Sequence, residues 1–317
     1  MEKILITPRG YARYGSEAGK RLEKLGYTLD VNDTGKPVPR EVFERKAEEA
    51  TGIIVGIDEL DAELIQRCRN LKAVVKFGVG VDNIDLTACR EKGIEVGRCV
   101  GTNSNAVAEM TIGYLFACAR NLVSNAIEVK EGGWSKPTGY ELGGKTIGIL
   151  GFGNIGKNVA RMAAGIGMKV MAYDVFEIPS EILEKYGAVQ TDKDMILRKC
   201  DFITVHVPLL AETKDMISEK EFKQMKRTAV LVNAARGGIV NEHDLYLALK
   251  NREIYACASD VFTSEPPMAA GQPWVKELLE NPYFIQTAHI ASRTEEAEKN
   301  TVEKATDVMI EMLGKNK

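Results

Sequence analysis

A short apolar run that leads directly into three spaced glycines constrains the fold of this chain more than any other stretch. Thr146–Leu150 reads as a buried strand, and Gly151, Gly153 and Gly156 follow it with G-x-G-x-x-G spacing. Glycine permits a tight turn at the first position, close approach of a pyrophosphate at the second, and close packing of a helix on the strand at the third. The stretch therefore predicts a dinucleotide site in which phosphates lie at a helix N-terminus.

An acidic residue at the end of the next predicted strand supports this interpretation. After a predicted helix, Lys157–Ile166, comes the apolar strand Lys169–Tyr173, and Asp174 lies 23 residues beyond Gly151. Alone, Asp174 could be an ordinary surface residue. At the end of a strand, glycine turn, helix and second strand, it is placed to accept the ribose hydroxyls of NAD and to repel the 2′-phosphate of NADP. The sequence thus favours NAD as the cofactor.

Composition excludes several other classes of protein. The net charge of -3 gives no reason to expect a nucleic-acid or membrane partner. We find no signal-peptide pattern and no apolar run long enough to span a bilayer. The six cysteines are scattered without C-x-x-C pairs, as in a cytoplasmic protein, and the three histidines are not clustered, so we expect no metal site.

The order of predicted elements indicates two α/β domains. The chain of 317 residues begins with alternating strands and helices, changes near residue 100, and alternates again from Lys145 to Gln286. The last predicted helix, Thr294–Leu313, should pack back on the first domain. We therefore expect a substrate domain of residues 1–101 and 287–317, with an NAD-binding domain of residues 102–286 inserted into it, each built on a doubly wound parallel sheet.

A long helix is predicted from about Ala106 to Lys130. Its apolar residues cover most faces, which is typical of a helix buried on several sides. Because two domains of one chain need not bury all of these residues, the helix also predicts a homodimer.

Three residues that can perform acid–base and carboxylate chemistry each follow one of three consecutive strands. Arg236 comes after Ala229–Val232, Glu265 after Ala256–Ala258, and His289 after Tyr283–Gln286. Arginine binds a carboxylate through two hydrogen bonds, and a histidine paired with a carboxylate can donate a proton near neutral pH. The carboxyl ends of parallel strands share one edge of a sheet, so these side chains are candidates for one active site.

Several stretches together resemble the D-isomer-specific 2-hydroxyacid dehydrogenase family, and its phosphoglycerate dehydrogenase-like branch in particular. The stretches that carry the resemblance are Gly78–Asp85, Ala106–Glu109, Gly151–Gly156, Asp174, His206–Leu209, Asn233–Gly237, Asp260–Pro266 and His289–Ser292. The resemblance implies a Rossmann domain inserted into a flavodoxin-like substrate domain. It implies that Arg236 binds the substrate carboxylate and carbonyl, that His289 exchanges the proton, and that Glu265 pairs with His289.

The resemblance also implies which residues bind the cofactor and the substrate. The expected cofactor-binding residues are Val79, Gly151, Gly153, Asn154, Ile155, Gly156, Asp174, Val207, Pro208, Thr213, Ala234, Ala235, Arg236, Asp260, His289 and Ala291. The expected substrate-binding residues are Lys76, Val79, Gly80, Lys136, Arg236 and His289, where Val79 and Gly80 would offer backbone N–H groups to the carboxylate.

The chain departs from well-known phosphoglycerate dehydrogenases at the third strand. Gly56 stands where those enzymes carry an arginine, whereas Lys76, Lys136 and Arg9 could supply positive charge for a phosphate. The sequence therefore favours 3-phosphoglycerate, with a hydroxypyruvate or glyoxylate reductase, or a general short-chain 2-hydroxyacid dehydrogenase, as the alternative. An NAD-sensing corepressor of the same fold is the alternative from another class. Formate dehydrogenases pair their histidine with a glutamine, and Glu265 argues against that activity.

Overall fold

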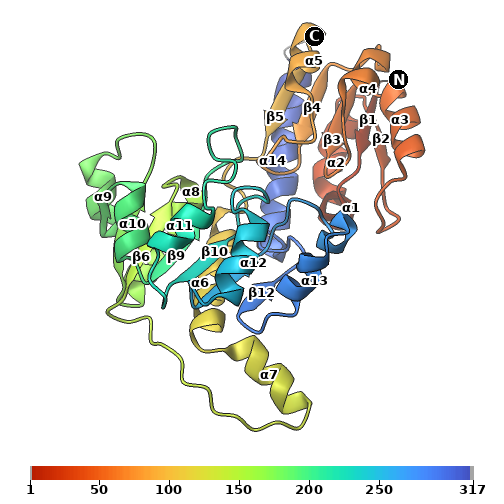
Figure 1. Cartoon of the computed structure of the whole chain (residues 1–317). Helices are drawn as coiled ribbons and strands as arrows, with labels where there is room; N and C mark the ends of the chain where they lie inside the picture. The colour runs from red at the N-terminus through yellow and green to blue at the C-terminus, as the bar shows by residue number, and fades with distance from the viewer. Residues whose placement is uncertain (1, 315–317) are drawn as a thin grey trace. The chain divides into compact units, whose positions relative to one another are not determined.

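The computed structural model describes residues 2–314, which form two compact α/β units (Figure 1). Unit 1 runs up to Asn103 and resumes at Arg293, and unit 2 is Ser104–Ser292. The chain returns from unit 2 to unit 1 after Ser292, which is later than the predicted boundary after residue 286. The physical reason is that the turn after the last strand is held within unit 2, because Ile290 and Ala291 donate backbone hydrogen bonds to the Asp260 carboxylate.

Unit 1 is a five-stranded sheet covered by helices. Its strands are β1 (Lys3–Ile6), β2 (Thr28–Val31), β3 (Gly52–Val55), β4 (Ala73–Lys76) and β5 (Glu95–Arg98), and its helices are α1 (Arg9–Tyr14), α2 (Ser16–Lys24), α3 (Arg40–Glu49), α4 (Ala62–Arg67), α5 (Leu86–Glu91) and α14 (Glu295–Gly314). The strands pair in parallel in the order β2-β1-β3-β4-β5. This is the flavodoxin-like order that the resemblance implies. All four residues of the central strand β3 are buried, as expected for a parallel strand with helices on both faces.

The last helix returns to unit 1, as the sequence predicted. The side chains of Met309 and Met312 on α14 are buried in the same core cluster as Ile4 of β1 and Val75 of β4. The Tyr11 hydroxyl of α1 also shares a buried hydrogen bond of 2.7 Å with Thr306.

Unit 2 is a seven-stranded sheet with helices on both faces. Its strands are β6 (Thr146–Leu150), β7 (Lys169–Tyr173), β8 (Ala188–Gln190), β9 (Phe202–Val205), β10 (Val230–Asn233), β11 (Ala256–Ser259) and β12 (Phe284–Gln286). Its helices are α6 (Ser104–Ala119), α7 (Leu122–Lys130), α8 (Asn154–Gly165), α9 (Ser180–Tyr186), α10 (Lys193–Lys199), α11 (Glu219–Gln224), α12 (Glu242–Lys250) and α13 (Pro273–Leu279), with a 3₁₀ turn at Pro267–Ala270.

The strand order of unit 2 is that of a dinucleotide-binding domain. All neighbouring strands are parallel, in the order β12-β11-β10-β9-β6-β7-β8. Counted from β6, this is the doubly wound order 3-2-1-4-5-6 with a seventh strand added at one edge. The order reverses between β6 and β9, so the glycine turn after β6 lies at the switch point where such sheets bind ligands.

The prediction of a single long helix from Ala106 to Lys130 is wrong. The structure contains two helices, α6 and α7, separated by Asn121, whose backbone has a positive φ of 52°. A left-handed residue cannot continue a right-handed helix, and asparagine tolerates this conformation better than most residues. The Tyr255 hydroxyl donates a 3.0 Å hydrogen bond to the Asn121 side chain and so holds the break.

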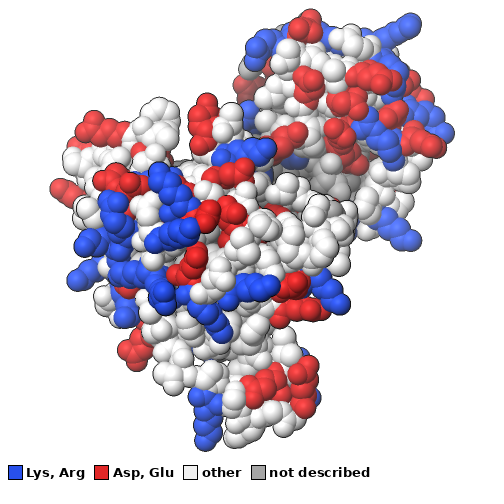
Figure 2. All heavy atoms as spheres, viewed as in Figure 1, with Lys and Arg blue, Asp and Glu red and all other residues white. Residues whose placement is uncertain are grey.

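Charged side chains of both signs are interspersed over the face drawn in Figure 2, in keeping with the small net charge. Among residues 2–314, no helix is both long and apolar enough to cross a membrane.

Candidate active site

The glycine turn after β6 is built as a dinucleotide cradle. Gly151 has a φ of +98°, and a Cβ at Gly156 would lie only 2.2 Å from the Gly151 carbonyl oxygen. The turn and the start of α8 are therefore in contact, which only glycine permits. A Cβ at Gly153 would meet no atom within 4 Å. Gly153 is the N-cap residue of α8, and glycine has no side chain that could cap the helix. The open space and the N-terminus of a helix of 12 residues fit a pyrophosphate.

Asp174 lies beside this turn at the carboxyl end of β7. Its carboxylate accepts backbone hydrogen bonds from Phe152 in the glycine turn at 2.8 Å and from Phe176 at 3.3 Å. These bonds fix a half-buried carboxylate next to the cradle, in the place where an acid binds the adenosine ribose of NAD. The residues present therefore fit NAD.

The loop after β9 borders the same turn. A Cβ at Gly151 would lie 2.9 Å from the backbone nitrogen of Val207, so the two segments are in contact. Thr213 shapes the loop, because its hydroxyl donates to the Pro208 carbonyl at 2.6 Å and accepts from the Leu210 N–H at 2.8 Å. The structure thus brings Val207, Pro208 and Thr213 together near the predicted cofactor site.

His289 and Glu265 form a direct pair, as the sequence predicted. Nδ1 of His289 lies 2.9 Å from one Glu265 carboxylate oxygen and 3.2 Å from the other. Burial raises the pKa of Glu265, but the hydrogen bond and charge of His289, the Phe262 N–H and the charge of Arg236 outweigh it and hold that pKa below its usual range. Glu265 is therefore ionised near neutral pH and places a negative charge beside the His289 ring. With Nδ1 engaged, the other ring nitrogen, Nε2, is left to exchange a proton with a substrate.

Arg236 lies in a turn that Asn233 holds together. The Asn233 side chain, at the end of β10, accepts the N–H of Ala235 at 3.1 Å and donates to the Arg236 carbonyl at 3.0 Å. The Arg236 guanidinium donates to the Ala235 carbonyl at 2.7 Å. Because the charge of Arg236 lowers the pKa of Glu265, the three catalytic candidates share one electrostatic environment.

Asp260 holds the turn that carries His289, a role that sequence reasoning missed. Its carboxylate is 1% exposed and accepts the N–H groups of Ile290 and Ala291, each at 2.8 Å, and the Thr287 hydroxyl. The Asp260 carbonyl also accepts the N–H of His289 at 2.9 Å. These bonds fix His289 in a left-handed conformation with a φ of 52°. The cofactor contact predicted for Asp260 stays a prediction.

Two further cofactor candidates lie behind this turn. Ala291 and Ala234 are buried together against Val107 of α6, and Ile155 of α8 packs on the same cluster. This packing joins the glycine-turn helix to the His289 turn. The contacts of these residues with NAD also stay predictions.

The other two histidines are poor candidates for the proton exchange. Burial lowers the pKa of His206 to about 3, so its ring stays neutral, and its buried nitrogens have no hydrogen-bond partner among the described residues. His243 lies on α12 with its ring 5.4 Å from that of Trp274, in an edge-to-face contact. His289 is the histidine placed for acid–base chemistry.

In unit 1, the candidate substrate residues follow β4. Gly78 has a φ of +150° and begins the bend that contains Val79, which is exposed, and Gly80, which is half-buried. The Lys76 ammonium donates hydrogen bonds to the Gly56 carbonyl at 2.6 Å and to the Asn83 side chain at 2.5 Å. Lys76 therefore ties the ends of β3 and β4 together, which is a structural role besides the substrate contact predicted for it.

Lys136 follows α7 and is exposed. Helix α6 starts near the carboxyl end of the unit 2 sheet, where Val107 packs on Ala234, and its 16 residues make it about 24 Å long. The segment at its other end contacts the amino end of β11, where the Asn121 side chain accepts the Tyr255 hydroxyl at 3.0 Å. Lys136 lies beyond that end, four residues before Tyr140. The substrate contact predicted for Lys136 stays a prediction.

A doubly wound domain with a glycine cradle, an acidic residue beside it and candidate arginine, glutamate and histidine residues at the sheet edge is typical of an NAD-dependent dehydrogenase. Residues 112–291 match the family described as D-isomer specific 2-hydroxyacid dehydrogenase, NAD binding domain. The chain belongs to the D-isomer specific 2-hydroxyacid dehydrogenase family. It is an oxidoreductase, and its cofactor is NAD.

Characterised relatives differ in substrate. The chain is 34% identical to a hydroxypyruvate reductase of Thermotoga maritima, with 96% of this chain and 99% of the relative covered. It is 37% identical to a D-3-phosphoglycerate dehydrogenase of Methanocaldococcus jannaschii, covering 94% of this chain but 55% of that protein, or about half its length. A D-lactate dehydrogenase of Aquifex aeolicus, solved with NAD and lactic acid, superimposes with a TM-score of 0.83 at 30% identity over 99% of this chain and 96% of that one.

Proposed function

We propose that the protein interconverts a short 2-oxo acid and its D-2-hydroxy acid, and that its preferred substrate is an unphosphorylated acid such as hydroxypyruvate or glyoxylate. The observation that carries the oxidoreductase assignment is the His289–Glu265 pair beside Arg236 at one sheet edge. NAD supplies or accepts the hydride. Arg236 binds the substrate carboxylate and polarises the carbonyl, and Nε2 of His289 donates the proton in reduction and accepts it in oxidation.

The position of the candidate cations supports an unphosphorylated substrate. A phosphate on carbon 3 carries nearly two negative charges and needs cationic partners. Of the three predicted cations, the Lys76 ammonium bonds to the Gly56 carbonyl and Asn83, and Lys136 lies beyond the far end of α6. The full-length similarity to a hydroxypyruvate reductase points the same way.

One observation favours 3-phosphoglycerate as the second candidate. Arg9 is exposed at the start of α1, directly after the Thr7–Pro8 turn. A Cβ at Gly56 would lie 3.7 Å from the Pro8 Cα, so this turn lies beside the position of the missing arginine. Arg9 can therefore supply a charge close to that position from the neighbouring strand.

Steady-state kinetics separate the two substrates. We expect efficient reduction of hydroxypyruvate or glyoxylate with NADH, and oxidation of D-glycerate by NAD at least as efficient as that of 3-phosphoglycerate. A clear preference for 3-phosphoglycerate that Arg9→Ala abolishes would establish the second candidate. The loss should then be roughly tenfold or more in KM, from ~1.5–3 kcal/mol for a hydrogen bond to a charged group. Arg13→Ala serves as the matched control, because Arg13 is an exposed arginine in the last turn of the same helix.

The same assay tests the alternative of a corepressor-like binding protein. A corepressor would bind NADH and leave every 2-oxo acid unreduced. Wild-type protein that binds NADH but turns over none of the acids would contradict the proposed activity.

We propose that the protein is a homodimer that associates through α7 and the segment after it. None of the residues of α7 is buried, and exposed apolar side chains gather there: Leu122, Val123, Ile127, Val129 and Trp134, which is 77% exposed. An apolar surface of this kind is typical of an interface between subunits. The buried free cysteines are in keeping with a reducing compartment, and we propose a cytoplasmic location.

Charge substitutions on α7 test the dimer. We expect wild-type protein to sediment as a dimer at micromolar concentration, and Val123→Glu with Ile127→Glu to halve the mass, because two buried charges at an interface cost several kcal/mol without partners. Val189→Glu, on the exposed edge strand β8, is the control and should leave the mass unchanged. A monomeric wild type would contradict the proposal.

A further inference from the structure

We propose that Glu242 is a positioning residue that holds the Glu265 loop against the Arg236 turn, and so sets the geometry of the catalytic trio. The inference rests on the proposed function, since it assigns a role in the same site. Glu242 is the first residue of α12 and lies six residues after Arg236.

Glu242 contacts the loop that carries Glu265. One carboxylate oxygen of Glu242 accepts both the backbone N–H of Thr263 at 2.5 Å and its hydroxyl at 2.8 Å. Thr263 lies two residues before Glu265, and the preceding N–H, of Phe262, donates to the Glu265 carboxylate at 3.2 Å. Hydrogen bonds to an ionised acceptor are among the stronger ones, so Glu242 fixes the peptide from which Glu265 projects.

The Arg236 turn meets the same peptide. A Cβ at Gly237 would lie 2.0 Å from the carbonyl carbon of Phe262 and 2.3 Å from the nitrogen of Thr263. Gly237 therefore packs its backbone directly on the peptide that Glu242 binds. Arg236 and Glu265 are thus placed relative to one another through a single peptide bond, which Gly237 contacts and Glu242 anchors.

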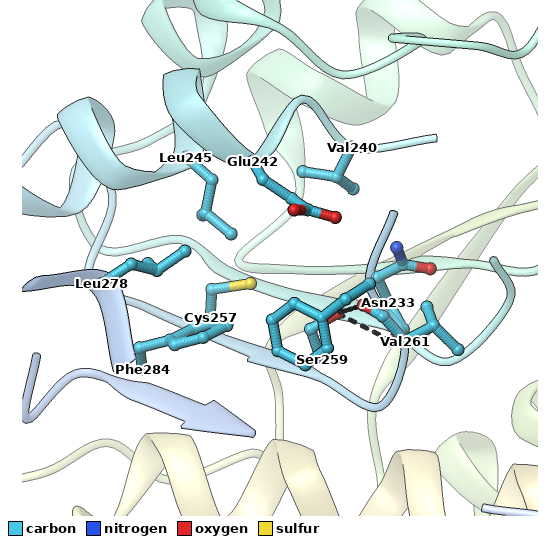
Figure 3. Close-up of a pocket in the computed structure, with 10 residues that line it drawn as sticks. Asn233, Val240, Glu242, Leu245, Cys257, Ser259, Val261, Leu278 and Phe284 are labelled. Atoms are coloured by element: carbon cyan, nitrogen blue, oxygen red, sulfur yellow. Dashed lines mark hydrogen bonds between the residues drawn. The ribbon is translucent and has the colours of Figure 1, made fainter. Parts of the chain in front are cut away.

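A small cavity adjoins this contact. Its volume is about 10 Å³, and Glu242, Asn233 and Ser259 are among the residues that line it (Figure 3). Such a volume has room for about one water molecule and cannot hold a substrate.

Loss of the hydrogen bonds between Glu242 and Thr263 should alter the contact between Glu265 and His289, while both of those side chains remain. Within unit 2, Arg236 and His289 are the charged groups that lower the pKa of Glu265, while His243 and Asp244 follow Glu242 on α12. If the loop moves, Glu265 makes weaker contacts with His289 and the Phe262 N–H, and its pKa rises toward the usual range. A misplacement on the order of 1 Å can cost up to about 10²-fold in rate.

The experiment compares Glu242→Ala and Glu242→Gln with Asp244→Ala. Asp244 is the matched control because it lies in the same first helical turn but accepts the N–H of Glu219, at 3.0 Å, and not the loop. We expect Glu242→Ala to lower kcat about tenfold or more, to leave NADH affinity nearly unchanged, and to raise the pKa of Glu265. Glu242→Gln, which keeps one acceptor oxygen, should show a smaller change, and Asp244→Ala should behave as wild type.

An NMR titration of the Glu265 carboxyl gives a readout that does not depend on turnover. We expect its midpoint to rise in Glu242→Ala and Glu242→Gln and to stay at the wild-type pH in Asp244→Ala. Equal midpoints in all four proteins, or the same shift in the control, would overturn the role of Glu242. A wild type that reduces no 2-oxo acid would instead overturn the proposed function, and the titration would still decide whether Glu242 positions Glu265.

Discussion

His289→Ala is expected to lower kcat for reduction of the 2-oxo acid by ~10²–10⁴-fold, which is the usual contribution of a general acid–base group. The carbonyl oxygen needs a proton as the hydride arrives, and Nε2 of His289 is the group placed to give it. Neither other histidine can replace it, because His206 is buried and neutral and His243 packs on Trp274. Stopped-flow and steady-state rates with NADH measure the effect.

Cofactor binding is the control for this substitution. The glycine turn follows β6 and Asp174 follows β7, whereas His289 follows β12. The dissociation constant for NADH, measured by fluorescence, should therefore change little. Arg236→Ala should cause a comparable loss with a higher KM, because it removes the partner of the substrate carboxylate. Near-normal turnover by His289→Ala would show that another group protonates the carbonyl.

Glu265→Gln distinguishes the charge of the pair from its geometry. The amide can keep a hydrogen bond to Nδ1, but the negative charge beside the ring is lost. Because the pKa of Glu265 lies below its usual range, wild type keeps this charge until the pH falls through that pKa. In the variant the charge is absent at every pH, so kcat near neutral pH should be lower and the acid limb that titration of Glu265 produces in wild type should disappear. The pH dependence of kcat and kcat/KM measures both effects.

The sequence predicted the elements that carry the site because the signals for those elements are local. The apolar run before Gly151 predicted β6 with its observed bounds, and Asp174 was proposed as the ribose contact because strand, turn and helix come in a fixed order. The three catalytic candidates were proposed together because each lies in the segment after a strand, and parallel strands end at one edge of a sheet.

Contacts between residues far apart in the sequence account for what was missed. The role of Asp260 depends on N–H groups about 30 residues later, and that of Glu242 depends on a loop about 20 residues later. The spacing of apolar and polar residues along the sequence does not indicate which distant residues form such contacts. The break at Asn121 was missed because apolar residues continue through it, while the Tyr255 hydroxyl that holds it lies more than a hundred residues away. The substrate contact of Lys136 was assigned by resemblance alone, and it stays a prediction.

Two alanine substitutions in the glycine turn should separate folding from cofactor binding. In Gly156→Ala, the new Cβ would lie 2.2 Å from the Gly151 carbonyl oxygen, so α8 must move away from the turn. We expect a loss of about 1–3 kcal/mol in the free energy of unfolding, as for an overpacked core, together with loss of NADH binding. In Gly153→Ala the Cβ meets no atom within 4 Å, so the protein alone should be as stable as wild type.

The cofactor makes the difference at Gly153. Its backbone is where the pyrophosphate approaches, and a methyl group there keeps the phosphates away from the N–H groups of α8. We therefore expect Gly153→Ala to weaken NADH binding about tenfold or more, or by at least ~1.4 kcal/mol, at an unchanged melting temperature. Gly165→Ala, at the other end of α8 with no atom within 4 Å of its Cβ, is the control, and it should leave NADH binding unchanged and not lower the melting temperature. Wild-type affinity in Gly153→Ala would mean that the pyrophosphate does not pass over this turn.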